Sequence, residues 1–378
     1  MARRVFLHIG PPKTGTSFLQ TAWWQHRREL AEQGLLYPGE QKMAHFRAAA
    51  VVLDKARVTE RMSPERLQMW DRLTGDVAAW DGDAIISDEH FAPASRAKAR
   101  TVLDRLAEVA DEVHVMVTAR DLARQVPAAW QQSVKQGSDR TFEEYWQDLA
   151  SHPRRGFWRL QHLPTVLNRW SQGVDPSRVH LVVHAPAGAP RSLLWERTCE
   201  LLGVDAAVLG PVSRTNESLG AGHVEVLRRM NAALPPDRSR IDFGRLTKTF
   251  FSQEILLPAG PSDRITLPPD IHAQVVARSV RMVGVLRSRS YDVIGDLDDL
   301  LPDEEPRPGR RPEQVAESEV AELASAALAR FLQHEMSRRR RTQRLARENR
   351  RLRRLQAETP EDEHRGALNL LRRIGRGG

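Results

Sequence analysis

Cysteine is nearly absent from this chain of 378 residues, in which Cys199 is the single example. One cysteine excludes a disulfide within the chain and a metal site built from several thiolates. Such usage fits the reducing cytoplasm, where we expect the protein to be located. Long apolar runs are also missing, since none approaches the ~18 residues that a membrane span requires. We therefore expect a soluble protein without a transmembrane segment.

The amino terminus has little of what a secretory signal needs. Its first ten residues, MARRVFLHIG, are basic and then apolar, as a signal peptide is. The apolar part ends after about six residues at Gly10, and no cleavage-like site follows. We interpret residues 5–9 as a buried strand instead.

Lysine is scarce as well, with six lysines against 51 arginines, so a lysine inside a motif is conspicuous. The excess positive charge lies near the carboxyl terminus. Ten arginines between Met336 and Glu358, against two glutamates there, account for the whole net charge of +8. Because the rest of the chain is balanced, composition alone does not indicate a nucleic-acid-binding protein.

Several interpretations of this basic segment stay open. It could bind nucleic acid, an anionic membrane surface or an acidic partner, or it could pair with another helix. A heptad pattern runs only from Leu345 to Leu355, which is too short to predict a coiled coil. The segment also lacks an aromatic face for membrane insertion. A solvated, partly disordered helix is the simplest alternative to contact with an anionic surface or partner.

Four short apolar segments predict strands, and helical stretches separate them. Strands separated by helices imply crossover connections and a mainly parallel, buried sheet. The sequence therefore predicts an α/β fold with helices on both sides of the sheet. The predicted strands are residues 5–9, 84–87, 112–118 and 179–183, and the predicted helices around them are residues 18–33, 95–109, 121–135 and 191–202.

Strand signals fade after Asn216, and the remaining periodic segments predict helices. These are residues 219–234, 269–289 and 315–358. The stretch 301–312 is rich in proline and is the best linker candidate. We expect an α/β domain over residues 1–300, a linker over 301–312 and a basic helical tail over 313–378, partly disordered.

The first predicted strand leads into a loop of unusual composition. The sequence Gly10-Pro-Pro-Lys-Thr-Gly-Thr-Ser17 precedes the predicted helix 18–33, which Gly34 closes. Unpaired backbone N–H groups and the positive end of the helix dipole meet at such a point and form an anion site. A Walker A loop needs a lysine directly after its second glycine. Here Lys13 precedes Gly15 by two positions, which disfavours a magnesium-bound triphosphate.

The segment Pro12-Lys-Thr-Gly-Thr-Ser-Phe-Leu-Gln20 resembles the 5′-phosphosulfate loop of sulfotransferases that use 3′-phosphoadenosine-5′-phosphosulfate (PAPS). The family motif is Pro-Lys-x-Gly-Thr, followed by Ser or Thr and then a leucine. The resemblance implies a P-loop-like sheet, PAPS as co-substrate and no metal. It also implies that Lys13 stabilises the leaving phosphate, and that the donor-binding loop consists of Lys13, Thr14, Gly15, Thr16 and Ser17.

A second part of the resemblance begins where the third predicted strand ends. In the family, a strand-end arginine and a serine eight residues later contact the 3′-phosphate of the donor. Arg120 occupies the first position, and its planar guanidinium suits a phosphate. Ala128 occupies the second, which removes one hydrogen bond. Arg124 or Ser133 could compensate, although Arg124 also reads as a solvated helix charge and Arg120 as one half of a carboxylate pair.

A base for the acceptor hydroxyl is expected at the same sheet edge. The second predicted strand ends in Ser87-Asp-Glu-His90, and carbohydrate sulfotransferases often carry a Ser-x-Glu segment here. The resemblance therefore makes Glu89 the first candidate for the base and His90 the second. A glutamate with an ordinary pKa of ~4.3 is a weak base, so its surroundings would have to raise that pKa. Alternatively, Asp88 and Glu89 cap the next helix or face solvent.

Two further histidines have competing interpretations. His45, between the first two predicted strands, could line an acceptor site or be a hydrogen-bonded histidine of the core or surface. His8 lies inside the first predicted strand, where a buried and hydrogen-bonded side chain is expected.

Together these features predict a cytoplasmic PAPS-dependent sulfotransferase. Its acceptor would be a hydroxyl of a carbohydrate, a glycolipid or a secondary metabolite, which rests on the resemblance alone. One alternative is a nucleoside-triphosphate-dependent kinase or NTPase, which the position of Lys13 disfavours. The other is a non-catalytic nucleotide-fold scaffold that binds through its basic tail, which Ala128 keeps open.

Overall fold

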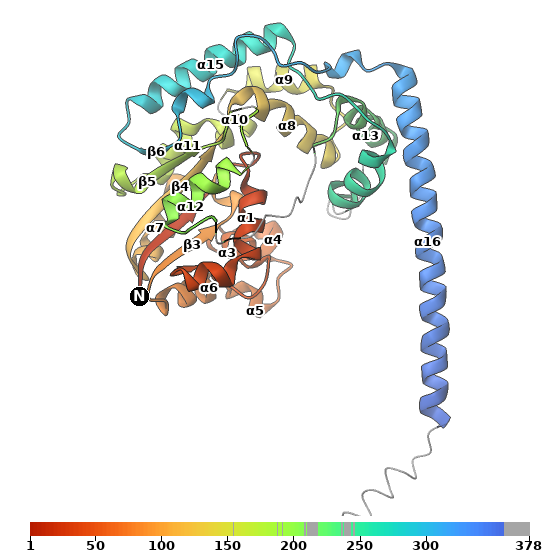
Figure 1. Cartoon of the computed structure of the whole chain (residues 1–378), viewed down its shortest axis with the longest axis horizontal. Helices are drawn as coiled ribbons and strands as arrows, with labels where there is room; N and C mark the ends of the chain where they lie inside the picture. Colours follow the sequence, from red (N-terminus) through yellow and green to blue (C-terminus); the bar gives the residue numbers. More distant parts are fainter. Residues whose placement is uncertain are drawn as a thin grey trace, which may run out of the picture.

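Six parallel strands form one sheet in the computed structural model of the chain (Figure 1). The structure describes residues 1–153, 155–186, 188–190, 192–207, 209, 218–235, 237, 243–244 and 246–358. The strand order is β2-β3-β1-β4-β5-β6, and every neighbouring pair is parallel. The predicted α/β class with a mainly parallel sheet is therefore confirmed. The strands are β1 (Ala2–His8), β2 (Leu35–Leu36), β3 (Asp83–Ser87), β4 (Ala110–Ala119), β5 (Val179–Val183) and β6 (Asp292–Ile294).

Helices cover both faces of the sheet and continue beyond it toward the carboxyl terminus (Figure 1). The α-helices are α1 (Thr16–Gln25), α2 (Arg27–Glu32), α3 (Ala44–Val52), α4 (Ala56–Thr59), α5 (Pro64–Leu67), α6 (Met69–Ala78), α7 (Arg96–Ala107), α8 (Leu122–Lys135), α9 (Phe142–Ser151), α10 (Gly156–Gln161), α11 (Leu163–Trp170), α12 (Leu193–Leu202), α13 (Ala221–Ala233), α15 (Pro269–Arg287) and α16 (Glu317–Glu358). Shorter turns are η1 (Glu89–Phe91), η2 (Pro176–Arg178), η4 (Leu257–Ala259), η5 (Leu297–Leu300) and η6 (Pro312–Gln314), and η3 (Leu246–Leu256) is π-helical.

The central strands are buried on both faces because successive side chains of a strand point to opposite sides. On one face, Phe6 of β1 belongs to an apolar cluster with Trp23 of α1 and Trp195 of α12. Its neighbours Val5 and Leu7 belong to a larger cluster on the other face, which the remaining helices complete. Because both faces are buried, apolar residues predominate in the sequences of the central strands.

All four predicted strands are present as β1, β3, β4 and β5. The edge strands β2 and β6 have no counterpart in the sequence prediction, because two or three residues are too few to show a periodic pattern. The helix predicted over residues 18–33 is divided at His26 into α1 and α2. Gly34, the predicted end of that helix, has a φ of +85°, which glycine adopts without strain.

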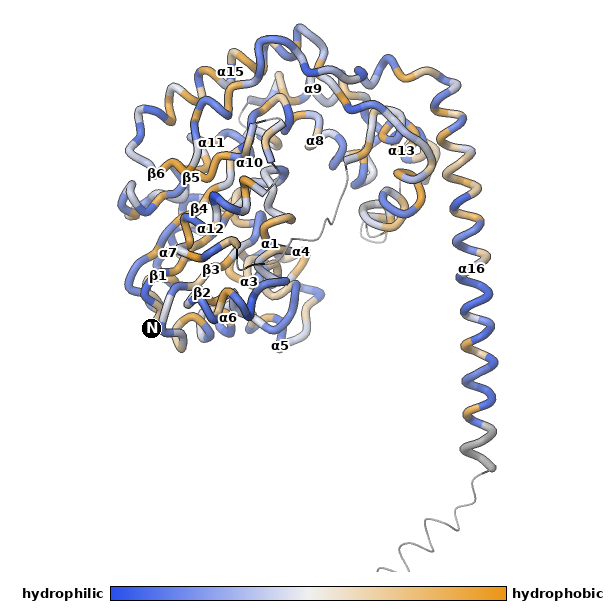
Figure 2. Tube along the Cα trace, in the orientation of Figure 1, coloured by the Kyte–Doolittle hydropathy of each residue, from blue (hydrophilic) through white to orange (hydrophobic). Residues whose placement is uncertain are grey.

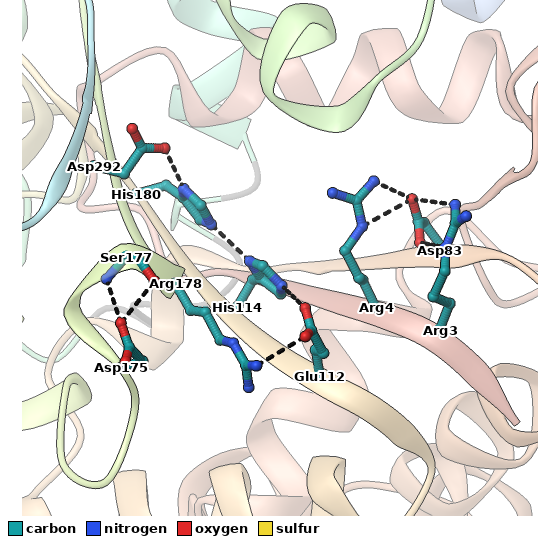
Figure 3. Close-up of polar contacts among 10 residues, drawn as sticks. All are labelled: Arg3, Arg4, Asp83, Glu112, His114, Asp175, Ser177, Arg178, His180 and Asp292. Atoms are coloured by element: carbon teal, nitrogen blue, oxygen red, sulfur yellow. Dashed lines mark hydrogen bonds and ion pairs between the residues drawn. The ribbon is translucent and has the colours of Figure 1, made fainter.

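Ionic contacts join β1 and β3 at their amino ends (Figure 3). Asp83, the first residue of β3, accepts hydrogen bonds from the Nε atoms of Arg3 and Arg4, each at 3.1 Å. Residue Arg4 pairs with Asp83 in the strand register as well. These contacts fix the end of the sheet that lies opposite the carboxyl ends of the strands.

A pair of histidines continues this polar row across β4, β5 and β6 (Figure 3). Atom Nδ1 of His114 lies 2.8 Å from Nε2 of His180, and the two rings are stacked. The outer ring nitrogens lie 3.1 Å from Glu112 and 2.7 Å from Asp292. Burial lowers the pKa of both histidines. The side of the sheet toward the amino ends of the strands thus carries two groups of structural polar contacts (Figure 3).

Residues 301–312 are hydrogen-bonded to the preceding part of the chain. The backbone of Arg310 pairs with Arg264 at 2.7 Å and with Thr266 at 3.1 Å in a short parallel bridge. Ring nitrogen Nε2 of His272 donates to the carbonyl of Asp303 at 2.8 Å. This segment, which the sequence suggests as a linker, therefore lies along the body of the protein.

The long helix α16 begins on the body and then leaves it (Figure 1). Val320, Leu323 and Ala327 are buried where the helix packs against α13, η3 and η4. Beyond His334, whose ring contacts Phe250, all residues described up to position 353 are exposed except the half-buried Glu335. This outer part is largely hydrophilic (Figure 2). Residues 359–378 lie outside the described residues.

Candidate functional site

Neighbouring strands bring the segments singled out from the sequence to one edge of the sheet. The loop of residues 10–17 follows β1, Glu89 follows β3, and Arg120 follows β4. Strand β1 lies between β3 and β4, and all three run parallel. Their carboxyl ends therefore lie side by side, at the edge where open parallel sheets bind ligands.

Positive φ angles shape the backbone of this loop. They occur at Gly10 (88°), Lys13 (70°) and Gly15 (91°). The conformation is strained at Lys13, because a side chain disfavours it, and such strain tends to occur at functional sites. Alternating φ signs along residues 13–16 turn successive N–H groups toward one side. In the part of the chain that the structure describes, the amides of residues 14–17 donate no hydrogen bond. These amides lie at the end of the loop and in the first turn of α1, and they are available to an anion.

Thr14 fixes the loop to the sheet beneath it. Its buried hydroxyl donates to the carbonyl of Pro11 at 2.6 Å and lies 2.6 Å from the hydroxyl of Thr118 on β4. Thr118 lies 3.2 Å from Nε2 of His8, whose Nδ1 is 2.8 Å from the hydroxyl of Ser87. Burial lowers the pKa of His8 to about 3, so this ring is neutral. The expectation of a buried, hydrogen-bonded His8 is confirmed.

Glutamines hold the outer side of the loop. Gln132 of α8 accepts a hydrogen bond from Nζ of Lys13 at 2.6 Å, which orients the ammonium group without adding a charge. Gln161 of α10 donates to the carbonyl of Pro12 at 2.7 Å. Gln125 supports this glutamine in turn with a bond of 2.8 Å. The lysine thus belongs to an ordered polar arrangement between the loop and α8.

Glu89 contacts the loop directly. The hydroxyl of Thr16, the first residue of α1, donates to Oε2 of Glu89 at 2.9 Å. A Cβ added at Gly10 would lie only 3.2 Å from Cα and Cβ of Glu89, so the two backbones approach closely. The carboxylate is therefore not a purely solvent-facing group. Ser17, the next hydroxyl residue of the loop, is exposed.

Asp88, and not Glu89, caps the turn after β3. Its Oδ1 accepts from the backbone N–H of His90 at 2.8 Å and lies 2.6 Å from Nδ1 of the same residue. The carbonyl of His90 accepts from Nζ of Lys55 at 3.0 Å, and its ring meets Phe46 edge-on. The two candidate bases therefore differ in surroundings, since Glu89 contacts the loop and His90 contacts Asp88.

Arg120 is a partly buried cation that forms no ion pair with a carboxylate among the described residues. Its Nη1 donates to the carbonyl of Lys13 at 3.4 Å, and its Nε is buried without a hydrogen bond. Burial, followed by the charge of Arg124, lowers its pKa to about 10, so it stays charged at neutral pH. The interpretation as a carboxylate-paired arginine does not hold. A partly buried cation without an ion-paired carboxylate, next to amides that donate no hydrogen bond, suits an anionic ligand.

The reading of Arg124 as a solvated helix charge is wrong. Its side chain is only 13% exposed, is paired with Asp121 and donates to the carbonyl of Ala185 at 3.0 Å. Ser133 returns its hydroxyl to a carbonyl of its own helix at 2.7 Å. Of the two residues considered as substitutes for the serine missing at position 128, Arg124 is therefore the one whose charge reaches Arg120.

His184 lies at the same edge and was not singled out from the sequence. It follows β5, and its backbone N–H donates to the carbonyl of Ala119 at 2.6 Å. Ring atom Nδ1 donates to the carbonyl of Ala185 at 3.1 Å. The ring lies against Gly15, because a Cβ added there would be 3.7 Å from Cδ2 and 3.9 Å from Nε2 of the histidine.

The surroundings keep the imidazole of His184 neutral. Burial is the main cause, the charges of Arg120 and Arg124 add to it, and together they lower its pKa to about 4. Glu89 and Arg120 are candidates because each lies just after a predicted strand, at a position that the family resemblance points to. The first of these two signals, applied to the strand at residues 179–183, would have found His184.

His45 is a histidine of the core. It is buried, its Nε2 donates to the carbonyl of Pro38 at 2.8 Å, and its Nδ1 accepts from the backbone N–H of Ser87 at 2.9 Å. The ring stacks on Tyr37, with centroids 4.2 Å apart. Burial lowers its pKa to about 4. Since both nitrogens are used, this side chain is structural and does not line an acceptor site.

The chain matches no protein-family model, and no curated protein or solved structure is found to be similar to it. Within the described residues, no helix combines the length and the apolar character that crossing a membrane requires.

Proposed function

We propose that this protein is a PAPS-dependent sulfotransferase that transfers a sulfuryl group to a hydroxyl. One observation carries the proposal: the loop amides of residues 14–17 donate no hydrogen bond among the described residues, and they lie beside the partly buried Arg120, which forms no ion pair with a described carboxylate. The position of Lys13, two residues before Gly15, favours a sulfated nucleotide over a magnesium-bound triphosphate.

The donor has anionic groups at both its 5′ and 3′ positions, and the site offers cationic or N–H groups for each. The amides of residues 14–17 would hold the oxygens of the 5′-phosphosulfate, with Lys13 close to the bridging oxygen. The guanidinium of Arg120 would bind the 3′-phosphate through paired hydrogen bonds. Arg124 and Arg307 add positive charge near it, since both repel the charge of Arg120.

The reaction needs little beyond positioning, one base and stabilisation of the leaving group. The acceptor oxygen attacks sulfur, and the hydroxyl proton passes to the carboxylate of Glu89, with His90 as the second candidate for this role. The bond between sulfur and the phosphate oxygen breaks, and its electron pair stays on the phosphate. Lys13 and the loop amides stabilise the negative charge that develops there.

The acceptor class and the location belong to the same proposal. A carbohydrate, glycolipid or secondary-metabolite hydroxyl is proposed from the resemblance of the loop sequence alone. A cytoplasmic location is proposed from the single cysteine, which is buried.

We further propose that the outer part of α16 contacts an anionic surface or partner. Its arginines from position 338 to 353 are exposed, and only Arg338 and Arg339 pair with a described carboxylate, that of Glu335. Co-sedimentation with vesicles rich in anionic lipid tests the surface. Replacing Arg338, Arg339, Arg340 and Arg341 by glutamine should reduce co-sedimentation, whereas replacing them by lysine should preserve it. Equal co-sedimentation of both variants contradicts this role.

Calorimetry with 3′,5′-adenosine bisphosphate and with ATP plus Mg²⁺ tests the enzymatic proposal. We expect the bisphosphate to bind more tightly, and Lys13→Ala to weaken it at least about tenfold by removing a charge-assisted contact. Lys98→Ala, at an exposed lysine paired with Asp54, serves as the matched control and should change nothing. Preference for ATP with Mg²⁺ contradicts the proposal and favours a kinase or NTPase. Absence of binding to either nucleotide favours a scaffold.

A further inference from the structure

One ring nitrogen of His184 has no hydrogen-bond partner among the described residues. Its Nδ1 donates to the carbonyl of Ala185, which fixes the proton of the neutral ring on that nitrogen. Nitrogen Nε2 accepts no hydrogen bond from any described residue, and the side chain is only half-buried. This nitrogen also lies close to Gly15, since it would be 3.9 Å from a Cβ added there.

The charges that face this ring come from two neighbouring elements. Arg120 follows β4, and Arg124 and Asp121 begin α8, where the last two are paired. The balance is therefore positive, and together with burial it holds the free imidazole neutral. Binding of an anion at the loop reverses this balance, because two negative charges next to the ring favour its protonated form.

We propose that His184 is a further ligand of the 5′-phosphate, and that it becomes an imidazolium only when this anion is bound. The proposal rests on the proposed function, because it requires a phosphate at the loop. The proton comes from water, enters at Nε2, and the resulting N–H donates to a phosphate oxygen. The imidazolium thus adds a third positive charge to those of Lys13 and Arg120 when the negatively charged nucleotide is bound.

Binding of the nucleotide is then coupled to uptake of a proton. The pKa of His184 is about 4 in the free protein and rises in the complex. Affinity therefore falls as the pH rises from about 4 through the higher pKa of the complex, above which His184 no longer contributes. The phosphate also titrates, with a second pKa near 6, so the contribution of His184 has to be isolated with a variant.

Calorimetry of 3′,5′-adenosine bisphosphate at pH 6.5, in two buffers of different ionisation enthalpy, measures the protons taken up. The wild type is compared with His184→Gln, which keeps a neutral N–H donor but does not titrate. We expect the wild type to take up at least about half a proton more than His184→Gln does, and to bind several-fold more tightly. His152→Gln, at an exposed histidine outside the site, is the matched control and should behave as the wild type.

Nitrogen NMR of the His184 ring in the wild type, with and without the bisphosphate, gives a second measurement that does not depend on a variant. The signal of Nε2 should move from that of an unprotonated to that of a protonated nitrogen. Equal proton uptake by wild type and His184→Gln, or an unchanged ring, overturns the role of His184 and leaves the sulfotransferase proposal intact. If the wild type binds no bisphosphate, both proposals are contradicted.

Discussion

The hydroxyl of Thr16 donates to Oε2 of Glu89 at 2.9 Å, and this bond joins the first turn of α1 to the segment that follows β3. The carboxylate and the unused loop amides therefore belong to one rigid arrangement. In the proposed reaction, Thr16 contributes one of the anion-binding amides, and its hydroxyl positions the base. Because the base and the anion-binding amides belong to different residues, a substitution can remove proton transfer and preserve donor binding.

Glu89→Gln should abolish the base and preserve the architecture. The amide oxygen still accepts the bond from Thr16, so affinity for 3′,5′-adenosine bisphosphate should change less than about twofold. Turnover should fall by about 10² to 10⁴, the usual contribution of a general base. Formation of the bisphosphate product from PAPS, in the presence of an accepted hydroxyl, measures this loss.

His90→Gln is the matched control for this substitution. The ring of His90 contacts Asp88 and Phe46, and its replacement should leave turnover within a few-fold of the wild type. The opposite pattern, in which Glu89→Gln is active and His90→Gln is inactive, would transfer the role of base to the histidine.

Gly15→Ala should disable the loop. The φ of this glycine is +91°, and an added Cβ would collide with Leu194 of α12, so the loop has to shift. Bisphosphate binding should become undetectable. Gly34→Ala is the control, because its φ of +85° imposes a similar strain of about 1 to 2 kcal/mol where no atom lies in the way. Equal loss of binding in both variants, at equal stability, would refute a specific role for the loop.

Arg120→Met should make the ligand-free protein more stable and the site weaker. The guanidinium is partly buried and forms no ion pair in the described part of the chain, and burial lowers its pKa to about 10. Removing this charge should raise the free energy of unfolding by roughly 1 to 3 kcal/mol. The urea midpoint should rise, and affinity should fall for 3′,5′-adenosine bisphosphate but little for 5′-AMP. A lower midpoint, or equal losses for both nucleotides, would contradict this assignment.

His45→Gln should reduce the sensitivity of the fold to acid. The folded-state pKa of His45 is about 4, below its ordinary value, so the unfolded chain binds more protons. Stability is therefore fully present above about pH 6.5 and is lost as the pH falls toward 4. Between pH 7 and pH 5 the wild type should lose roughly 2 kcal/mol more free energy of unfolding than the variant. Equal losses in urea titrations at the two pH values would show that this histidine is not neutral in the fold.

The architecture follows from the sequence where burial dictates composition. Strands β1, β3, β4 and β5 are recognisable because their central parts are buried on both faces and consist mainly of apolar residues. The edge strands β2 and β6 are recognised only through their pairing with β3 and β5, which is a tertiary property. The break at His26 likewise has no proline or glycine to signal it.

The site is predictable to the extent that it depends on strand ends. The strand-edge rule, that residues following neighbouring parallel strands share an edge, predicts a base near Glu89, and the family resemblance predicts a phosphate ligand at Arg120. The missing counterion of Arg120 and the pairing of Arg124 with Asp121 depend on side-chain directions, which spacing does not determine. No motif of the sequence includes His184, although its place directly after β5 obeys the strand-edge rule.

The most direct test of the central claim is a crystal structure of the protein with 3′,5′-adenosine bisphosphate. The account predicts that oxygens of the 5′-phosphate lie within about 3.2 Å of the amide nitrogens of residues 14–17, with Lys13 in contact. It also predicts that the 3′-phosphate contacts Arg120. A nucleotide bound at any other place, with these amides facing solvent or protein, would contradict it.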